Sequence, residues 1–365
     1  MFNDRTVLQV IPTLEVGGAE RVCINLHSGL ERLGVRVKLI TLVEAKRATF
    51  SAVPEVLGLG GARARNALIS LTLQLRSSEA VGVISHLHHG VAVSQIAILL
   101  CRLVGRRFRH VAVLHSCIIS TRDAYCRTFR GRIAWRLLAY LYRRADVVVC
   151  VSSGARDQAR ATLRLKESQL RLIYNPVIDE RSAPFRAAVP GRGCSFAFLG
   201  RLEHVKGCDL LLDAFSLARF TSAPRLLVGG DGSMRAELEQ MSVDRGISGR
   251  VEFCGMVDAS SWLEGVSALV VPSRSEALPT VMIEAVARGL PVIAFDCSPG
   301  VRELARMYPS IVLVQNGDTA SLAKAMEELE VSLSAAGNSA DDVLATFGFD
   351  VAARKYLEAL GASGH

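Results

Sequence analysis

The sequence has no C-x-x-C pair, no Asp-x-Asp pair and no apolar stretch long enough to cross a membrane. Its nine cysteines are scattered, which argues against a zinc site or a disulfide framework and predicts reduced thiols. The longest apolar helix that the pattern predicts, at 90–100, contains Ser94 and Gln95 and is too short for a membrane span. We expect no secretory signal, because a strand is predicted directly at 6–11.

The length predicts two domains, since 365 residues exceed what one hydrophobic core usually organises. Charge is divided unevenly between the two halves of the chain. Residues 1–190 contain 28 Lys and Arg against 13 Asp and Glu, whereas residues 191–365 contain 15 against 22. The basic first half therefore favours an anionic partner, for which nucleic acid, a membrane surface and a phosphorylated lipid all qualify.

The basic residues are densest at 122–144, where arginines alternate with aromatic side chains. On a helix, this pattern is typical of an element that docks on a membrane surface. The alternative is a solvated arginine-rich face whose aromatic rings enter the core, and both interpretations stay open. No recognisable nucleic-acid-binding motif accompanies the basic half, so we do not expect nucleic acid as a partner.

The stretch at 267–296 predicts a strand, a polar loop, a helix and a second strand. The helix is expected to begin near Pro279, because proline fits the first helical turn, and to end at Gly289. Strands that are joined by a helix in this way usually pair in parallel. The loop between strand and helix is therefore predicted at the carboxyl edge of a parallel sheet, where such folds bind ligands.

Two carboxylates, Glu276 and Glu284, mark this loop and helix. Backbone N–H groups at Leu278 and Thr280 would point out of the helix start, which favours a phosphate group. A carboxylate accepts hydrogen bonds from the hydroxyl groups of a sugar or a ribose. Because Glu284 stands among apolar residues, where an unpartnered charge is costly, we interpret both carboxylates as ligand-binding groups and not as surface residues.

Two further loops carry residues that suit an anion. The loop GRLEHVKG holds Arg201 and Lys206 between glycines, and a fixed guanidinium and a mobile ammonium can hold a diphosphate from two sides. Gly17 and Gly18 stand between an expected strand and an expected helix, where the backbone can approach a ligand closely. A glycine pair taken alone is weak evidence for a site.

Histidines form another candidate group. His86, His88 and His89 suggest a metal site, but no carboxylate or cysteine completes a ligand set, so we expect no metal there. His115 follows the strand expected at 111–114, and a neutral imidazole at that position can hydrogen-bond a sugar hydroxyl. The alternative for His115 is a loop histidine without a role.

The spacing Glu276-x7-Glu284 within SRSEALPTVMIEAVARGLPVIAFD resembles the signature of the retaining glycosyltransferases of family 4. Further motifs match in the expected order, including GGAER, His115 and GRLEHVKG, and the resemblance extends over nearly the whole chain. Ala277 departs from the glycine that many members have, with little expected consequence, because alanine suits a helix start. The resemblance implies an α/β protein of GT-B fold, with two Rossmann-like, doubly wound domains facing across a cleft.

The domain boundaries follow from this resemblance and from composition. We expect an acceptor-binding Rossmann-like domain at 1–178, a linker at 179–192 and a nucleotide-sugar-binding domain at 193–349. The linker is rich in Pro, Gly and small or charged residues. A terminal helix at 350–361 is expected to pack back on the first domain.

The resemblance also implies roles for individual residues. Arg201 and Lys206 would hold the donor diphosphate, and Glu276 and Glu284 would hold the sugar and the ribose. His115 would contact the transferred sugar, so His115, Glu276, Arg201 and Lys206 are the expected catalytic residues. The remaining donor contacts are expected at Gly17, Gly18, Gly255, Met256, Leu278, Pro279 and Thr280.

The implied reaction is the retaining transfer of a hexose or an N-acetylhexosamine from a nucleotide diphosphate sugar, UDP-linked on family frequency. Since the Asp-x-Asp pair is absent, we expect the two cations and the helix start, and no metal ion or other cofactor, to stabilise the leaving diphosphate. Residues 297–303 resemble a variant that is associated with galactose or N-acetylated hexosamine donors. No carboxylate stands out as a nucleophile, which favours front-face displacement.

The expected acceptor is a lipid-linked or cell-surface glycan, such as a lipopolysaccharide precursor. The enzyme would then be a cytoplasmic protein that contacts the anionic inner face of the cytoplasmic membrane. Two alternatives stay open: a nucleotide-sugar epimerase of GT-B fold, and a noncatalytic protein that binds anionic ligands.

Overall fold

The computed structural model describes residues 6–14, 17–43, 56–60, 64–181, 195–331 and 340–361. Most of the expected linker, at 182–192, lies outside the described residues, as do residues 332–339 of the expected second domain. The chain divides into two compact units. Unit 1 is formed by Met1–Glu180 together with Thr346–His365, and unit 2 by Arg181–Ala345.

Unit 1 contains a seven-stranded sheet whose strands all run parallel, in the order β3-β2-β1-β4-β5-β6-β7. The strands are β1 (Thr6–Ile11), β2 (Arg36–Thr41), β3 (Val56–Gly58), β4 (Ala80–His86), β5 (Arg109–Leu114), β6 (Val147–Cys150) and β7 (Leu170–Leu172). The helices are α1 (Gly18–Arg32), α2 (Ala64–Ser77), α3 (Leu87–Leu103), α4 (Ile118–Cys126), α5 (Phe129–Arg144), α6 (Ser153–Leu163) and α14 (Phe349–Ala359). The direction of the strand order reverses between β1 and β4, which makes their carboxyl ends a topological switch point.

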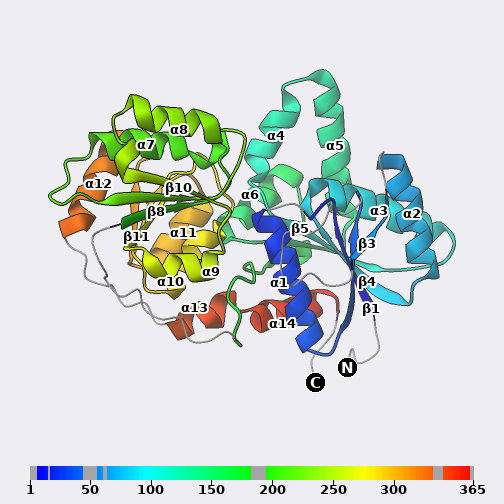
Figure 1. Ribbon diagram of the computed structural model, residues 1–365. Coiled ribbons are helices and arrows are strands. Elements are labelled where there is room, and N and C mark those ends of the chain that lie inside the picture. Colours follow the sequence, from blue (N-terminus) through cyan, green and yellow to red (C-terminus); the bar gives the residue numbers. More distant parts are fainter. Residues whose placement is uncertain are drawn as a thin grey trace. The chain divides into compact units, whose positions relative to one another are not determined.

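Unit 2 repeats this plan with a six-stranded parallel sheet in the order β10-β9-β8-β11-β12-β13. Its strands are β8 (Ser195–Leu199), β9 (Arg225–Gly229), β10 (Val251–Gly255), β11 (Ala268–Val271), β12 (Val292–Phe295) and β13 (Ile311–Val314). Its helices are α7 (Cys208–Leu217), α8 (Arg235–Asp244), α9 (Ala259–Trp262), α10 (Thr280–Ala287), α11 (Pro299–Met307) and α12 (Thr319–Val331), and α13 (Ala340–Phe347) leads back toward α14. Here the switch point lies between β8 and β11. The predicted α/β class with two doubly wound parallel sheets is confirmed (Figure 1).

The central strands are largely apolar because both faces of each sheet are covered. All residues of β1, β6, β11 and β12 are buried. The core of unit 2 gathers large side chains from strands and helices alike, including Phe196, Phe215, Phe295 and Met326. Most polar residues therefore lie near the strand ends and in the loops that follow them, and Gln9 in the middle of β1 is a fully buried exception.

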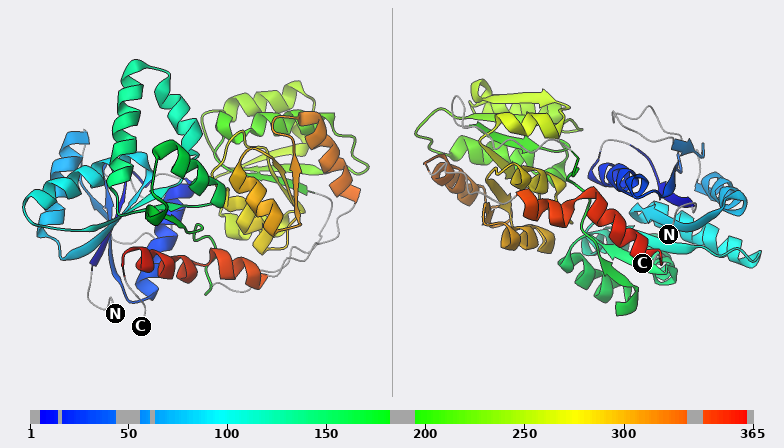
Figure 2. Two further views of the ribbon diagram at one scale, coloured as in Figure 1. Left: turned by 180° about the vertical axis from the view of Figure 1, so that it is seen from behind. Right: turned by 90° about the horizontal axis from the view of Figure 1, so that it is seen from below.

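The last helix, α14, belongs to unit 1 and packs against α1, as both views of the ribbon show (Figures 1 and 2). Gly29 makes the close approach possible, since a Cβ there would overlap the carbonyl oxygen of Phe349. Arg32 at the end of α1 donates two hydrogen bonds to Asp179, at 2.7 and 2.5 Å, and lies 3.8 Å from Asp350. The contact thus joins three distant segments of the chain.

The arginine-rich stretch at 122–144 forms two helices and not one. The first ends at Cys126, and Thr128 caps the second, because its hydroxyl oxygen accepts a hydrogen bond of 3.0 Å from the backbone N–H of Gly131. The resulting α4–α5 hairpin stands out from unit 1 (Figures 1 and 2). Among the described residues, no helix has both the length and the apolarity that crossing a membrane requires.

The helix α10 begins one residue later than its sequence suggested. Pro279 precedes the helix as its N-cap, in extended conformation with φ −71° and ψ 110°, and Thr280 is the first helical residue. The end of the helix is as expected, since Gly289 follows it in the left-handed region with φ 71°. Proline therefore orients the chain that enters the helix without occupying its first turn.

Gly207 is among the glycines of unit 2 that have no room for a side chain. Gly207 adopts φ 70°, and a Cβ on it would overlap the carbonyl oxygen of Pro272. Gly246 adopts the similar value of φ 66° with open space around it. Comparing substitutions at the two positions therefore distinguishes the free-energy cost of a left-handed backbone from the additional cost of a steric overlap.

We predict that Gly207→Ala destabilises unit 2 more than Gly246→Ala does. Both variants should lose roughly 1–2 kcal/mol because alanine is strained in the left-handed region. The Gly207 variant should lose more, since the loops at Gly207 and Pro272 must also move apart. Urea denaturation of both variants measures the difference, and equal losses would contradict the packing described here.

Candidate active site

An ion pair connects two loops of unit 2 at the switch point between β8 and β11. Lys206 follows β8, Glu276 follows β11, and the Lys206 Nζ and Glu276 Oε1 atoms lie 2.6 Å apart. The hydroxyl of Ser273 donates a second hydrogen bond to the same carboxylate oxygen, at 2.8 Å. The Glu276 side chain is only 13 % exposed, and these two partners supply its hydrogen bonds in place of water.

A second ion pair holds the same two loops in register. Arg274 donates two hydrogen bonds to Asp209 at the start of α7, at 2.8 and 2.6 Å, and a third to the carbonyl of His204, at 2.6 Å. The backbone N–H of Arg274 also donates to the carbonyl of Val205. Burial raises the pKa of Asp209, but the hydrogen bonds and charge of Arg274 outweigh it, so the pKa lies below its usual value.

The loops after β12 and β13 reach the same edge of the sheet. The Cys297 thiol follows β12, and burial, with a further contribution from the charge of Glu276, raises its pKa to about 12. Asn316 follows β13 and donates a hydrogen bond of 3.3 Å to the carbonyl of Arg274. Four loops from four neighbouring strands thus converge near Glu276.

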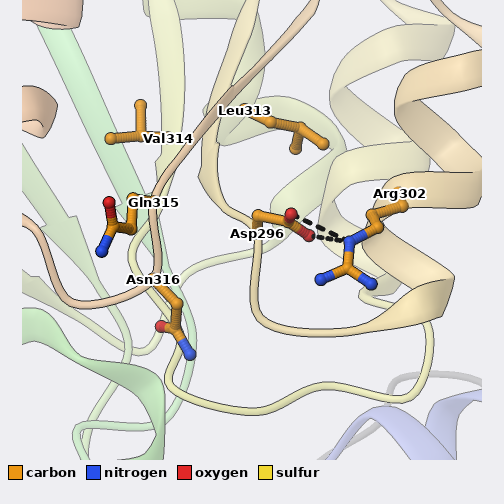
Figure 3. Close-up of a pocket in the computed structure, with 6 residues that line it drawn as sticks. All are labelled: Asp296, Arg302, Leu313, Val314, Gln315 and Asn316. Carbon is orange, nitrogen blue, oxygen red and sulfur yellow. Dashed lines mark hydrogen bonds and ion pairs between the residues drawn. The ribbon is translucent and has the colours of Figure 1, made fainter.

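A polar pocket lies beside this convergence. It is lined by Asp296, Arg302, Leu313, Val314, Gln315 and Asn316 (Figure 3). Asp296 and Arg302 form an ion pair of 2.6 Å on one side, and the amide groups of Gln315 and Asn316 lie on the other. The lining offers both hydrogen-bond donors and acceptors to a polar ligand.

Glu284 lies inside α10 and is buried, with 6 % of its surface exposed. Arg288, one turn further along, is also buried and donates a hydrogen bond of 2.7 Å to the main-chain oxygen of Glu284. Leu278, just before the helix, is buried as well. Leu278, Glu284 and Arg288 are thus all withdrawn from solvent, and the N-terminal end of α10 favours an anion.

The switch point of unit 1 carries the glycine pair and the histidines. Gly17 is the N-cap of α1, and Gly18 is its first residue. His115 follows β5, and its Nε2 atom lies 2.9 Å from the Nδ1 atom of His86 at the end of β4. Burial, reinforced by His88, lowers the pKa of His115 to about 3, so the ring is neutral at physiological pH.

His86 and His88 have different surroundings and do not form a metal site. His88 is bonded to the Tyr142 hydroxyl and to Ser116, both at 2.8 Å, and burial lowers its pKa to about 4. No group of three or more His, Cys, Asp or Glu side chains in the described part of the chain is placed to hold a metal ion.

Comparison with known proteins connects this geometry to one enzyme class. A family model described as "Glycosyltransferase Family 4" matches residues 16–181, and one described as "Glycosyl transferases group 1" matches residues 193–330. The chain belongs to the family 4-type glycosyltransferases.

Two relatives and one solved structure illustrate how far the similarity extends. An uncharacterized glycosyltransferase of Haemophilus influenzae is 28 % identical over 330 residues, which cover 86 % of each chain. The lipopolysaccharide 1,6-galactosyltransferase of Salmonella typhimurium is 30 % identical over 44 % of this chain and 45 % of its own length. The crystal structure of Anabaena HepE in complex with UDP and glucose superimposes with a TM-score of 0.80 at 18 % identity, covering 98 % of this chain and 99 % of HepE. HepE thus shares the GT-B fold of this chain.

The predicted site residues of the glycosyltransferase differ in their contacts, their exposure and the unit to which they belong. Lys206 and Glu276 are in contact, whereas Arg201 is exposed on the same loop as Lys206. Gly255 ends β10 with φ 67° and accepts a hydrogen bond from Gly230, and Met256 beside it is 53 % exposed. Gly17, Gly18 and His115 belong to unit 1, and the other predicted residues belong to unit 2.

Sequence reasoning did not propose several residues that contact the predicted ones or their loops: Ser273, Arg274, Asp209, Asn316 and the partner histidine His86. Four of the five lie within a few residues of the carboxyl end of a strand, and this position was the signal that could have found them. Asp209 lies at the start of a helix, and no local pattern marks its pairing with an arginine 65 residues away.

We predict that Asp209→Asn destabilises the folded state at neutral pH but not in acid. The folded-state pKa of Asp209 lies below its unfolded value of about 3.9, so the carboxylate contributes stability above that pH. The contribution is lost as the pH falls through the lower folded-state pKa. The loss at pH 7 should be roughly 1–2 kcal/mol, because both side chains keep some contact with solvent.

Urea denaturation at neutral and acidic pH tests this prediction. Glu252→Gln is the matched control, since it breaks an exposed ion pair with Arg225 and should cost less than about 1 kcal/mol. A loss in Asp209→Asn that stays constant down to acidic pH would show that the carboxylate charge is not what stabilises these loops.

Proposed function

We propose that this glycosyltransferase moves a hexose or an N-acetylhexosamine from UDP to a lipid-linked or cell-surface glycan, with retention of configuration and without a metal ion. The observation that carries the proposal is the Lys206–Glu276 pair at the switch point of unit 2. Open α/β sheets bind their ligands at such a point. A cation for a diphosphate and a carboxylate for sugar hydroxyls lie there side by side.

The chemistry of transfer would use these groups as follows. The bond between the sugar carbon and the diphosphate oxygen breaks, and negative charge develops on the departing diphosphate. Lys206, the exposed Arg201 and the packed start of α10 would stabilise that charge. The acceptor hydroxyl attacks the same face of the sugar, and its proton passes to the leaving diphosphate. No protein nucleophile is needed for this sequence of steps.

The choice of donor and acceptor draws on the relatives. HepE was solved with UDP and glucose, and the Salmonella relative is named as a lipopolysaccharide galactosyltransferase. Glu284, buried in α10, would hold the ribose, and the open backbone turn at Gly255 and Met256 would lie against the base. The polar pocket beside Glu276 suits the hydroxyl groups of a sugar.

A membrane contact is supported by one face of α5. Phe129, Ile133, Leu137 and Tyr140 are spaced as one helical stripe and are 47–69 % exposed, and we name them the α5 stripe. Trp135, Leu138, Ala139 and Tyr142 fill the opposite face and pack into the core of unit 1. Exposed arginines flank the stripe, namely Arg130, Arg136 and Arg144. An apolar stripe with basic flanks suits the anionic inner face of the cytoplasmic membrane.

We predict that UDP raises the melting temperature of the protein more than GDP or ADP does. A ligand that binds only the folded state stabilises it in proportion to RT ln(1 + [L]/Kd). Glu284→Gln should weaken UDP binding by about 10-fold or more, because a hydrogen bond to a charged group is lost. Glu252→Gln, on the exposed side of β10, should leave the shift unchanged.

A transfer assay completes this test. With a UDP-sugar and a lipid-linked acceptor, the product should keep the anomeric configuration of the donor, and EDTA should not reduce the rate. A product with inverted anomeric configuration in its NMR spectrum, or inhibition of the reaction by EDTA, would contradict the proposal. So would a folded sample whose melting temperature does not change when UDP is added. Lys206→Met should lower kcat by about 100-fold or more.

We predict that the α5 stripe binds vesicles that contain phosphatidylglycerol. Ile133→Ser/Leu137→Ser should reduce sedimentation with these vesicles, and added salt should weaken binding of the unmodified protein. Ile69→Ser/Leu73→Ser is the matched control, because these side chains are equally exposed and equally spaced on α2. Equal binding by both variants would show that the stripe is not the contact.

A further inference from the structure

A chain of buried hydrogen bonds leads to His115 from the centre of the unit 1 sheet. It starts at Gln9 in β1, which is fully buried. The Gln9 Nε2 atom lies 3.2 Å from the carbonyl oxygen of Cys23. A carbonyl oxygen can only accept a hydrogen bond, so this contact fixes which end of the amide is nitrogen.

The orientation of Gln9 then fixes the hydrogens of its neighbours. Its Oε1 atom can only accept, so His27 Nδ1, at 3.1 Å, is the donor. Its Nε2 atom can only donate, and it lies 3.5 Å from His86 Nε2, which therefore accepts. His86 is fully buried, and burial together with the neighbouring His115 lowers its pKa well below the usual value, so the ring is neutral. A neutral ring that accepts at Nε2 carries its hydrogen on Nδ1.

That hydrogen points at the ring of the predicted catalytic histidine. His86 Nδ1 lies 2.9 Å from His115 Nε2, which must accept it. The two rings are also stacked, with centroids 5.1 Å apart and an angle of 26° between their planes. His115 is neutral, so its own hydrogen lies on Nδ1. Within the described part of the chain, His115 Nδ1 makes no hydrogen bond of its own.

We infer that His86 is a positioning residue, which fixes His115 as the Nδ1–H tautomer so that His115 offers its ligand a hydrogen-bond donor. The group it suits is an oxygen acceptor, such as a sugar hydroxyl or a phosphate oxygen, and it is not placed to act as a general base. This inference deepens the proposed function and rests on it for the identity of the ligand. The tautomer itself rests only on the contacts of Gln9, His86 and His115.

The backbone beside His86 supports a special role for this position. Leu87 adopts φ 62°, one of two residues other than glycine in the left-handed region among the described residues. Such a conformation costs roughly 1–2 kcal/mol for a residue with a Cβ. It lies at the junction of β4 and α3, where His86 is the N-cap of the helix. Strain that is held at the carboxyl end of a strand is typical of a functional position.

The direct test is NMR of the full-length protein labelled with 15N in its histidine rings. The chain has only eight histidines, and the protonated and unprotonated nitrogens of a neutral ring resonate at well-separated frequencies. The signals of His115 are assigned by their loss in His115→Gln. We expect Nδ1 of His115 to be protonated and Nε2 to be unprotonated. A His115 ring with its hydrogen on Nε2, or a doubly protonated ring at neutral pH, would overturn the inference.

Two variants of His86 test the positioning role. His86→Asn keeps an N–H donor near the position of Nδ1, whereas His86→Leu removes it. In His86→Leu, His115 should no longer be held as the Nδ1–H tautomer, and kcat/KM should fall by at least about 10-fold. In His86→Asn, His115 should keep mostly the Nδ1–H tautomer, and most of kcat/KM should be retained. A His115 spectrum that is the same in His86→Leu as in the unmodified protein would overturn the inference.

His110→Leu is the matched control. His110 is also fully buried and is bonded to Ser85, at 2.6 Å, and to Gln95, but no hydrogen bond or ring contact joins it to His115. Its replacement should lower the melting temperature without changing the ring signals of His115. The spectra do not depend on the donor sugar, so a failed transfer assay with the expected spectra overturns the proposed function and leaves the tautomer assigned.

Discussion

The ion pair between Lys206 and Glu276 is the constraint on which the edge of unit 2 depends. A carboxylate that is largely buried needs partners for its charge, and here the cation comes from the loop of the neighbouring strand β8 and the hydroxyl donor from the loop of Glu276 itself. The two loops can approach each other this closely because Gly207 has no Cβ, which would overlap the carbonyl oxygen of Pro272. In the proposed function, the same pair would hold the charge of Lys206 in place before a diphosphate binds.

The helices and strands could be predicted from the sequence, but the contacts between their loops could not. Apolar strand segments and glycines that end helices are local patterns. The α/β fold class and the strand-loop-helix unit around Glu276 were therefore predicted from the sequence. The contact between Lys206 and Glu276 joins residues 70 positions apart, and no local pattern states that their loops touch. The exact start of α10 could not be predicted either. Proline suits both the N-cap and the first turn of a helix, and only the structure shows that Pro279 is the N-cap.

The histidines show why residues that are close in sequence need not act together. His86 ends β4 and His88 lies in the first turn of α3, so the chain changes direction between them. His86 consequently faces Gln9 and His115, while His88 ties Ser116 to Tyr142. A sequence that suggested one cluster of three histidines thus contains two separate hydrogen-bond systems. Both converge on the loop after β5, which limits how far His115 can move.

The packing of α14 on α1 has a consequence for the order of events during synthesis. Unit 1 begins at the start of the chain but needs residues after Thr346 to cover Gly29 and Arg32 of α1. All of unit 2 is made in between, which takes roughly 10–30 s at ribosomal rates. The unit that is synthesised first is therefore the last to be completed, and α1 presents an uncovered surface on the ribosome for that whole interval.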